Sequence, residues 1–253
     1  MLLTTMGVVI GERAYGENDK FIDVFTKDYG IIEVTVKGGR KLNSKNSAST
    51  ALFSYSKFCV SKRGERYYLN SSEIENTFYD LRFDVKKLAL ASYFAELLKY
   101  TVLSYDSDES YEIILKLLLN TLYYLEKDSH NIMLLKSIFE FRLLSEIGLI
   151  PNLIGCSICN VYSHTKMHFN VQEGKLYCDN CFSGSDGYNI ILVNESTLSA
   201  LRHISLSAMN ILFNIKVSDR LLSELNKITD RYTFAHINRS FKTLEYFKNI
   251  SKL

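Results

Sequence analysis

The hydrophobic pattern of the chain changes its period near residue 75, and this change limits the fold more than any other feature. Before that point apolar and polar side chains alternate, as they do in Ile31–Lys37. After it apolar residues recur every three to four positions, as in Leu88, Ala91 and Ala95. A period of two is typical of half-buried strands, and a period of 3.6 is typical of helices. The sequence therefore predicts an α+β protein in which a β module precedes a helical one.

The β module is predicted to span residues 1–78 and to form a small barrel. Strands are expected at Leu3–Glu12, Lys20–Thr26, Ile31–Lys37, Ala51–Ser61 and Arg66–Ser71. Turn-forming residues at Lys27–Gly30 and Lys62–Glu65 indicate tight hairpins, whereas the connection Gly38–Thr50 is long, polar and basic. Short strands with one long loop fit a closed barrel, for which an OB-fold is the leading candidate and an SH3-like barrel stays open.

Residues 79–253 are predicted to form a mostly helical domain. Helical periodicity covers Asp84–Ser104, Asp108–Glu126 and Asn131–Ile147, each beginning with a good N-cap residue. Gly148 and Pro151 are expected to end the third helix. Three or four further helices are expected after Asn194, with Asn194 and Ser218 as N-caps. A cysteine-bearing insert is predicted at 154–184.

Four of the five cysteines form two Cys-x2-Cys pairs separated by eighteen residues. The pairs are Cys156 with Cys159 and Cys178 with Cys181. Two such pairs can place four thiolates at the corners of a tetrahedron, which is the geometry of structural zinc. We expect one structural zinc ion, because four protein ligands leave no position for water or substrate. Iron bound by four thiolates would give the same pattern, so the choice of metal stays open.

The other histidine and cysteine residues are not expected to bind the metal ion. His164 and His168 lie within the insert and are expected at the surface, because four cysteines already complete a site. Cys59 lies on a predicted strand and is expected to be a small buried apolar residue.

The apolar start Met1–Ile10 lacks the charged and small-residue flanks of a signal peptide, and no run reaches the roughly 20 apolar residues of a membrane helix. We therefore expect a cytoplasmic protein with no membrane partner.

The net charge of +2 conceals an uneven distribution. Val36–Arg66 has eight basic residues and one acid, a net +7, and Lys216–Leu253 has a net +4, so the remainder carries −9. A local basic surface can bind phosphates whatever the total charge. The first segment is predicted to bind DNA, whereas the mixed signs of the second fit a solvated face equally well. The predicted DNA-binding residues are Lys37, Arg40, Lys41, Lys45, Lys62, Arg63 and Arg66.

Aromatic residues lie among these cations. They are Phe53, Tyr55, Phe58, Tyr67 and Tyr68. On an OB-type barrel cations follow phosphates and rings stack on bases, so binding would be largely independent of sequence and weakened by salt. About half of the rings should instead fill the barrel, because strand side chains alternate. Since no phosphate-binding loop, metalloprotease helix or nucleophile elbow appears, a binding protein is favoured over an enzyme.

Several motifs together resemble the bacterial RecO family of DNA repair and recombination proteins over essentially the whole chain. They are Glu17–Lys20 with Ile22–Thr26, the basic segment Val36–Lys41, Phe139–Leu144 followed by Gly148, Pro151 and the first cysteine pair, the Gly174 hairpin with the second pair, and Arg239–Phe241. The resemblance implies an OB-fold, a helical domain and a zinc finger, with DNA contact at Lys37, Arg40 and Lys41 and metal ligation at the four cysteines. It further implies binding to single- and double-stranded DNA, strand annealing, and assembly with RecR. Recognition of single-stranded-DNA-binding protein, help in loading RecA, and a place at the nucleoid are also implied.

Other functions stay open on the sequence. One is an interaction hub, in which a partner's acidic, apolar-tipped tail seats between helices near Arg142 or Lys136. Another is an RNA-binding zinc-ribbon protein. A hydrolytic enzyme fits least well, since its motifs are missing.

Overall fold

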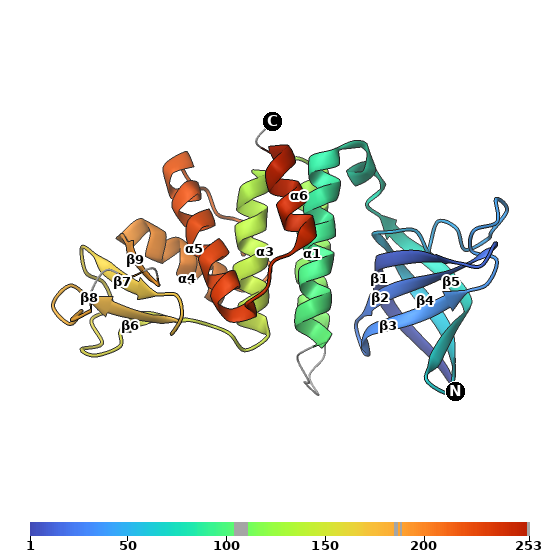
Figure 1. Cartoon of the computed structure of the whole chain (residues 1–253), viewed down its shortest axis with the longest axis horizontal. Helices are drawn as coiled ribbons and strands as arrows, with labels where there is room; N and C mark the ends of the chain where they lie inside the picture. Colours follow the sequence, from blue (N-terminus) through green and yellow to red (C-terminus); the bar gives the residue numbers. More distant parts are fainter. Residues whose placement is uncertain (104–110, 185–186, 188, 252–253) are drawn as a thin grey trace. The chain divides into compact units, whose positions relative to one another are not determined.

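The computed structural model describes residues 1–103, 111–184, 187 and 189–251 (Figure 1). By the contacts within the chain, these residues form two compact units. One unit is Met1–Lys127 together with Phe241–Leu253, and the other is Asp128–Ser240. The boundary predicted at residue 78 concerns independent folding and stays a prediction. The predicted helix cap at Asp108 lies outside the described residues.

The first unit begins with a closed five-stranded barrel of OB type. Its strands are β1 (Leu2–Tyr15), β2 (Asp19–Thr26), β3 (Gly30–Val36), β4 (Ser54–Arg63) and β5 (Arg66–Thr77). They follow the order β1-β2-β3-β5-β4, with a parallel contact between β3 and β5 and antiparallel contacts elsewhere. The α+β prediction, with an N-terminal barrel before a helical region, is confirmed.

Alternation along the strands fills the barrel. The inward side chains that form its core are Leu3, Val9, Ile22, Val24, Ile32, Val34, Val36, Phe58 and Val60. Gly7 allows β1 and β2 to approach closely, because a Cβ atom there would lie 2.7 Å from Val24 Cγ1 and 2.8 Å from the Phe25 carbonyl oxygen. A register shift between Val9 and Gly11 lets the long strand β1 bend around the barrel.

The hairpins follow the predicted turns, whereas two strand ends do not. Gly30 and Gly64 both have positive φ, 61° and 60°, in the two hairpins expected from the sequence. Strand β5 continues to Thr77, past the predicted end at Ser71, because β4 pairs with the polar run across two bulges. Strand β4 begins at Ser54 and not at Ala51, since Phe53 has φ +60°, which no strand residue adopts.

The helices of the first unit are η1 (Tyr79–Phe83), α1 (Val85–Leu103), α2 (Glu112–Glu126) and α6 (Lys242–Ser251). Asp84 caps α1, since its Oδ1 accepts from the backbone N–H groups of Lys86 and Lys87. The C-terminal helix packs on α1: Thr243 Oγ1 donates to Glu96 at 2.5 Å. The end of the chain thereby joins the unit that contains its beginning.

The second unit contains α3 (Ile132–Glu146), α4 (Glu195–Leu206) and α5 (Asp219–Ile237). A four-stranded sheet lies between α3 and α4 in the sequence. The sheet has the order β6-β8-β7-β9, from β6 (Asn152–Cys156), β7 (Met167–Asn170), β8 (Lys175–Cys178) and β9 (Ile190–Val193). Side chains of Asn131, Asn194 and Ser218 cap the three helices, which confirms all three as predicted N-caps. Among the described residues, no helix has both the length and the apolar character needed to cross a bilayer.

A buried ionic cluster joins α3 to α5. Lys136 is fully buried, and its Nζ donates to Glu140 Oε2 at 2.8 Å and to Asp230 Oδ1. Burial alone would lower the pKa of Lys136, but the two carboxylates outweigh it and raise that pKa. Lys136 is therefore a buried cation, and the prediction that it receives a partner's tail is wrong.

Replacing Lys136 by Ala should lower the free energy of unfolding by about 3–5 kcal/mol, because Glu140 would stay buried without a counter-charge. The double variant Lys136→Met/Glu140→Leu removes both charges and should stay within about 1–2 kcal/mol of the parent. Urea denaturation measures both. Equal losses for the two variants would show that the lost packing, and not the uncompensated charge, sets the result.

Candidate nucleic-acid interface and metal centre

The four cysteines of the two pairs meet at one point of the second unit. Their sulfur atoms all lie within 4.8 Å of one another. Cys156 ends β6 and Cys178 ends the neighbouring strand β8, so the pairing of these strands brings both turns together. Within each turn a backbone N–H returns to the first carbonyl, from Asn160 to Cys156 and from Cys181 to Cys178. The structure thus assembles the predicted four-sulfur set.

The chemistry of this set fits a metal ion. Burial raises the pKa of Cys156, but the backbone N–H groups of Cys159, Cys178 and Ile158 outweigh it and lower the pKa to about 6. Hydrogen bonds from its thiol to the neighbouring sulfurs raise the pKa of Cys181 to about 12. The Cys156 thiolate therefore forms readily, whereas the Cys181 thiol would need a bound cation to ionise. Elsewhere in the described chain, no comparable His, Cys, Asp or Glu cluster occurs.

His168 supports the second cysteine turn and lies outside the sulfur cluster. Its Nε2 lies 2.8 Å from Asp179 Oδ1, and its ring stacks on Phe182 with centroids 4.1 Å apart. Only 13% of its side chain is exposed, so the prediction of a surface residue is wrong for His168. Contacts with the turn that holds Cys178 and Cys181 explain its burial.

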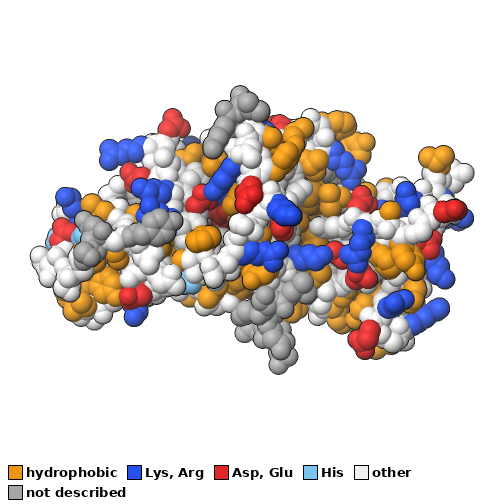
Figure 2. Space-filling view, in the orientation of Figure 1, with side chains coloured by type: hydrophobic (Ala, Val, Ile, Leu, Met, Phe, Trp, Pro, Cys, Tyr) orange, Lys and Arg blue, Asp and Glu red, His pale blue; other side chains and the backbone are white. Residues whose placement is uncertain are grey.

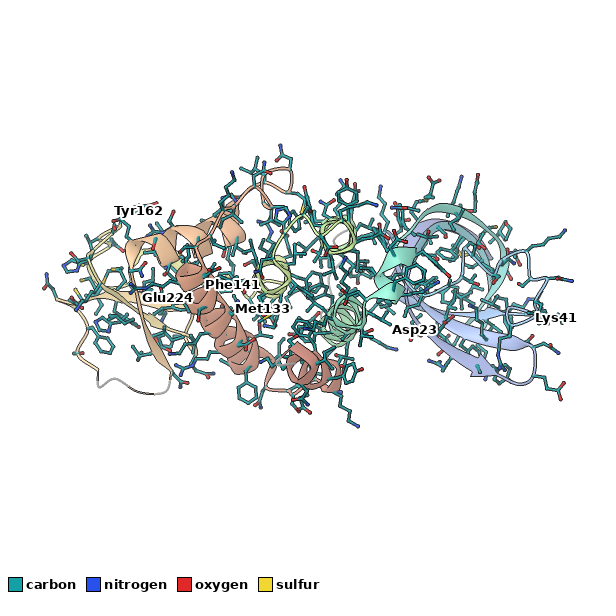
Figure 3. The ribbon with its side chains drawn as sticks, turned by 90° about the horizontal axis from the view of Figure 1, so that it is seen from above. Asp23, Lys41, Met133, Phe141, Tyr162 and Glu224 are labelled. Atoms are coloured by element: carbon teal, nitrogen blue, oxygen red, sulfur yellow. The ribbon has the colours of Figure 1, made fainter. Side chains whose placement is uncertain are left out.

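Arg202 of α4 holds the first cysteine turn. Its guanidinium donates to the carbonyl oxygens of Leu153, Ile154 and Tyr162 at 2.6–2.9 Å and lies 3.8 Å from the Tyr162 ring centroid. Tyr162 is labelled in Figure 3. Gly155 is needed beside it, because a Cβ there would lie 2.9 Å from the Val161 carbonyl oxygen. Sequence reasoning missed Arg202, since about 40 residues separate it from the turn and no motif links them.

The seven predicted DNA-binding cations form two separate groups on the barrel. Lys37, Arg40, Lys41 and Lys45 lie in the loop between β3 and β4, and Lys62, Arg63 and Arg66 lie at the β4–β5 hairpin. The hairpin is near the start of β1, where Leu2 pairs with Ser61, and the loop is near its end, where Tyr15 pairs with Asp19. The two groups come closer where β3 contacts β5, because Thr35 pairs with Tyr68 and Lys37 and Arg66 each lie two positions from this pair.

The loop cations differ in what they contact. Lys37, Lys41 and Lys45 are exposed and form no ion pair within the described residues. Arg40 instead donates to the carbonyl oxygens of Gly16 and Glu17 at 3.0 and 3.2 Å, so it holds the β1–β2 turn. A hollow of about 600 Å³, lined in part by Arg40 and Lys41, lies beside this loop, and Figure 3 shows Lys41 at this end of the barrel.

The rings singled out from the sequence divide between core and surface. Phe53 and Phe58 are fully buried, so they are unavailable for stacking on bases. Tyr67 is partly buried against the barrel core, with Lys62 Nζ 5.5 Å from its ring centroid. Tyr68 points outward and has Arg63 5.4 Å from its ring centroid.

An outward row that sequence reasoning missed runs between the two cation groups. Arg13, Phe21, Thr35 and Tyr68 pair in register across β1, β2, β3 and β5, so their side chains share one face. Arg13 lies 5.2 Å from the Phe21 ring centroid, and the exposed Tyr15 ring lies 4.5 Å from Phe21. We call Arg13, Tyr15, Phe21 and Tyr68 the barrel platform. Alternation hints at it, but only the register shows that Phe21 and Tyr68 lie in one row, on either side of Thr35.

Helices of the same unit cover the rest of this face. Lys99 of α1 donates to Asp23 of β2 at 2.5 Å, and the Tyr111 ring lies 6.0 Å from Phe25. Asp23 lies on the side of the barrel toward α1 in Figure 3. The helices therefore close one half of the face and leave the barrel platform open.

Arg142 is engaged within the second unit. Its Nε donates to Glu146 at 2.6 Å, and its Nη1 donates to the carbonyl oxygens that end α4, at Ile204, Ser205 and Ser207. It therefore caps a helix C-terminus. The hypothesis that Arg142 receives a partner's tail loses its support.

Comparison with known proteins decides the family. Residues 1–78 match the family described as Recombination protein O N terminal, and residues 82–245 match Recombination protein O C terminal. The chain belongs to the RecO family. It is 31% identical to the DNA repair protein RecO of Acetivibrio thermocellus, covering 99% of this chain and 98% of the relative. It is 33% identical to that of Alkaliphilus metalliredigens, covering 99% and 100%. The resemblance drawn from the sequence motifs is confirmed.

Metal analysis of the purified protein should return about one bound ion per chain, and it separates zinc from iron. The double variant Cys159→Ser/Cys181→Ser should lose the ion and expose residues 152–193 to limited proteolysis, because the ion holds the two turns together. The barrel should stay resistant. Cys59→Ser is the control, since Cys59 lies outside the cluster. An unchanged cleavage pattern in the metal-free double variant would contradict a structural role for the ion.

Proposed function

We propose that the protein binds single- and double-stranded DNA through its barrel and promotes the pairing of complementary strands. The barrel platform, flanked by two basic groups in a chain of the RecO family, carries this proposal. Arg13 is paired with Glu33 and Asp23, so the flanking cations would neutralise phosphates while the rings stack on bases. The binding would be largely independent of base sequence.

The barrel suggests a path for one strand. The loop cations and the hairpin cations lie beyond the two ends of the barrel platform, so a strand that crosses the rings would meet basic side chains on both sides. Two DNA strands repel each other, and their neutralisation on one protein raises their effective concentration. Pairing then follows from binding alone. No step requires a side chain to make or break a bond, so we propose a mediator and not an enzyme.

Membership of the RecO family supports further partners. We infer that the protein assembles with RecR, recognises single-stranded-DNA-binding protein, and helps to load RecA at the nucleoid in the cytoplasm. A groove of about 730 Å³ is lined by apolar side chains that include Leu134, Phe213 and Leu222 and by polar ones that include Lys216 and Asp219. Its apolar part and Lys216 could receive the acidic, apolar-tipped tail of such a partner. This groove replaces Arg142 and Lys136 as the place where we expect the tail.

For the four cysteines we propose one structural zinc ion. Cys156, Cys159, Cys178 and Cys181 would fill all four of its positions, so the ion would supply a cross-link between β6 and β8 and no catalysis. Arg202 would position the first turn from α4. The zinc finger would then be a rigid part of the second unit.

The triple variant Lys37→Gln/Lys41→Gln/Lys45→Gln should weaken DNA binding and flatten its salt dependence. Each lost phosphate contact reduces the slope of log K against log salt concentration by about 0.7 on a single strand, so the total change should be about 2. Lys86→Gln/Lys116→Gln/Lys127→Gln removes the same charge from α1, α2 and the C-cap of α2, and is the control. Equal salt slopes for the two triple variants would contradict binding of DNA by the loop. A separate competition between DNA and RNA of equal length tests the RNA-binding alternative.

Phe21→Ala should weaken binding to a single strand without changing the salt slope, because it removes stacking and leaves the cations. A stacked base is worth about 1–3 kcal/mol, which corresponds to roughly 5- to 150-fold in affinity. Phe21→Tyr should restore binding, since it keeps the ring. If Phe21→Ala binds as tightly as the parent, bases do not stack on the barrel platform.

A further inference from the structure

One large apolar side chain lies at the tip of the basic loop between β3 and β4. This residue is Leu42, and it is fully exposed. The Ser44 backbone N–H donates to the Lys41 carbonyl oxygen at 3.0 Å, so a tight turn places Leu42 at its first corner. A single exposed leucine is common on protein surfaces. Its meaning here therefore depends on how the tip is held and on what surrounds it.

The barrel holds both legs of this loop. On the first leg, the Gly38 backbone N–H donates to Asp19 Oδ1 of β2 at 2.7 Å. On the second leg, Asn46 Oδ1 accepts from Ser72 Oγ of β5 at 3.2 Å. Leu42 lies between these two anchors, four residues from each. Because the loop is anchored on both sides, little conformational freedom is lost when a partner covers its tip.

The surroundings of Leu42 at the tip are basic. Lys41 and Lys45 are exposed on either side of it in the sequence, and segment 37–50 contains no acid. The acids near the loop lie at its base and comprise Glu12, which accepts from Lys20 Nζ, Asp19, which accepts from Gly38, and Glu17 of the β1–β2 turn. The tip therefore combines one apolar side chain with net positive charge. Figure 2 shows Lys and Arg side chains around this end of the barrel.

We propose that Leu42 inserts between two neighbouring bases of the strand whose phosphates the loop lysines hold. The inference rests on the proposed function and deepens it. Leucine is one of the apolar residues that proteins insert between bases, and the insertion unstacks them. Burial of its side chain between base faces removes apolar surface from water, which offsets part of the cost of unstacking. A strand whose base stack is interrupted folds less readily on itself, so its bases are free to pair with a second strand.

A nucleic acid fits this tip better than a pocket on a protein partner. In a single strand the apolar faces of the bases lie within one nucleotide of the phosphates, so one short turn can contact both. The core of a protein interface carries few charges and is depleted in lysine. A protein pocket that received Leu42 would have to accommodate Lys41 and Lys45 as well. The chemistry of the tip therefore favours a base step.

The fluorescence of 2-aminopurine tests this inference, because this base is quenched when it stacks on its neighbours. Full-length protein is titrated into a single-stranded oligonucleotide of 2-aminopurine–adenine repeats, so that a probe lies at the loop in every register. The parent should raise the fluorescence at saturation, Leu42→Ala should lose most of the rise, and Leu42→Met should restore it. The affinity of Leu42→Ala should fall by roughly three- to tenfold with an unchanged salt slope, because apolar burial is lost and no phosphate contact is.

The control variant is Leu206→Ala, which truncates another exposed leucine, at the end of α4 in the second unit. It should behave as the parent does. An equal rise in Leu42→Ala and the parent, or no rise in a parent that binds the strand, would overturn the inference and leave Leu42 to a protein pocket. Equal losses in Leu42→Ala and Leu206→Ala would overturn it as well. A parent that binds no strand would defeat the proposed function itself, and the inference with it.

Discussion

The pairing of β5 with both β3 and β4 closes the barrel, and the surface offered to DNA depends on this closure. Once every strand is paired, each side chain must point either inward or outward. Val24, Val34 and Phe58 fill the interior, and Phe21 and Tyr68 are thereby set on the outside. A slip of one residue in the register would exchange the two faces. Gly7 and the bulge before Gly11 help to fix this register. They let β1 approach β2 closely and bend around the barrel.

Much of the fold could be predicted from local signals. The change of period separated barrel from helices, and Asn194 and Ser218 cap the helices they were expected to cap. The cysteine spacing likewise predicted the sulfur cluster, since two short turns at the ends of adjacent strands are a local property. The extension of β5 to Thr77 could not be predicted, because polar residues there become a strand only through pairing with β4.

The functional surface was less predictable, because a count of charged residues does not say which charged side chains are exposed and which are engaged within the fold. The side chains of Arg40 and Arg142 donate hydrogen bonds to backbone carbonyl groups, and Lys136 is buried with two carboxylates. Phe21 was missed for a related reason: strand pairing alone places it in one row with Arg13 and Tyr68, and Tyr68 is far from it in sequence.

Crosslinking to a labelled single strand, followed by mapping of the attached residues, tests the central claim most directly. The barrel platform predicts attachment at Tyr15, Phe21 and Tyr68, with further sites in the loop that carries Lys37 and Lys41. Attachment should disappear as salt rises, because phosphate contacts hold the strand in place. Crosslinks confined to the zinc-finger sheet or the helices, with none on the barrel, would contradict the account.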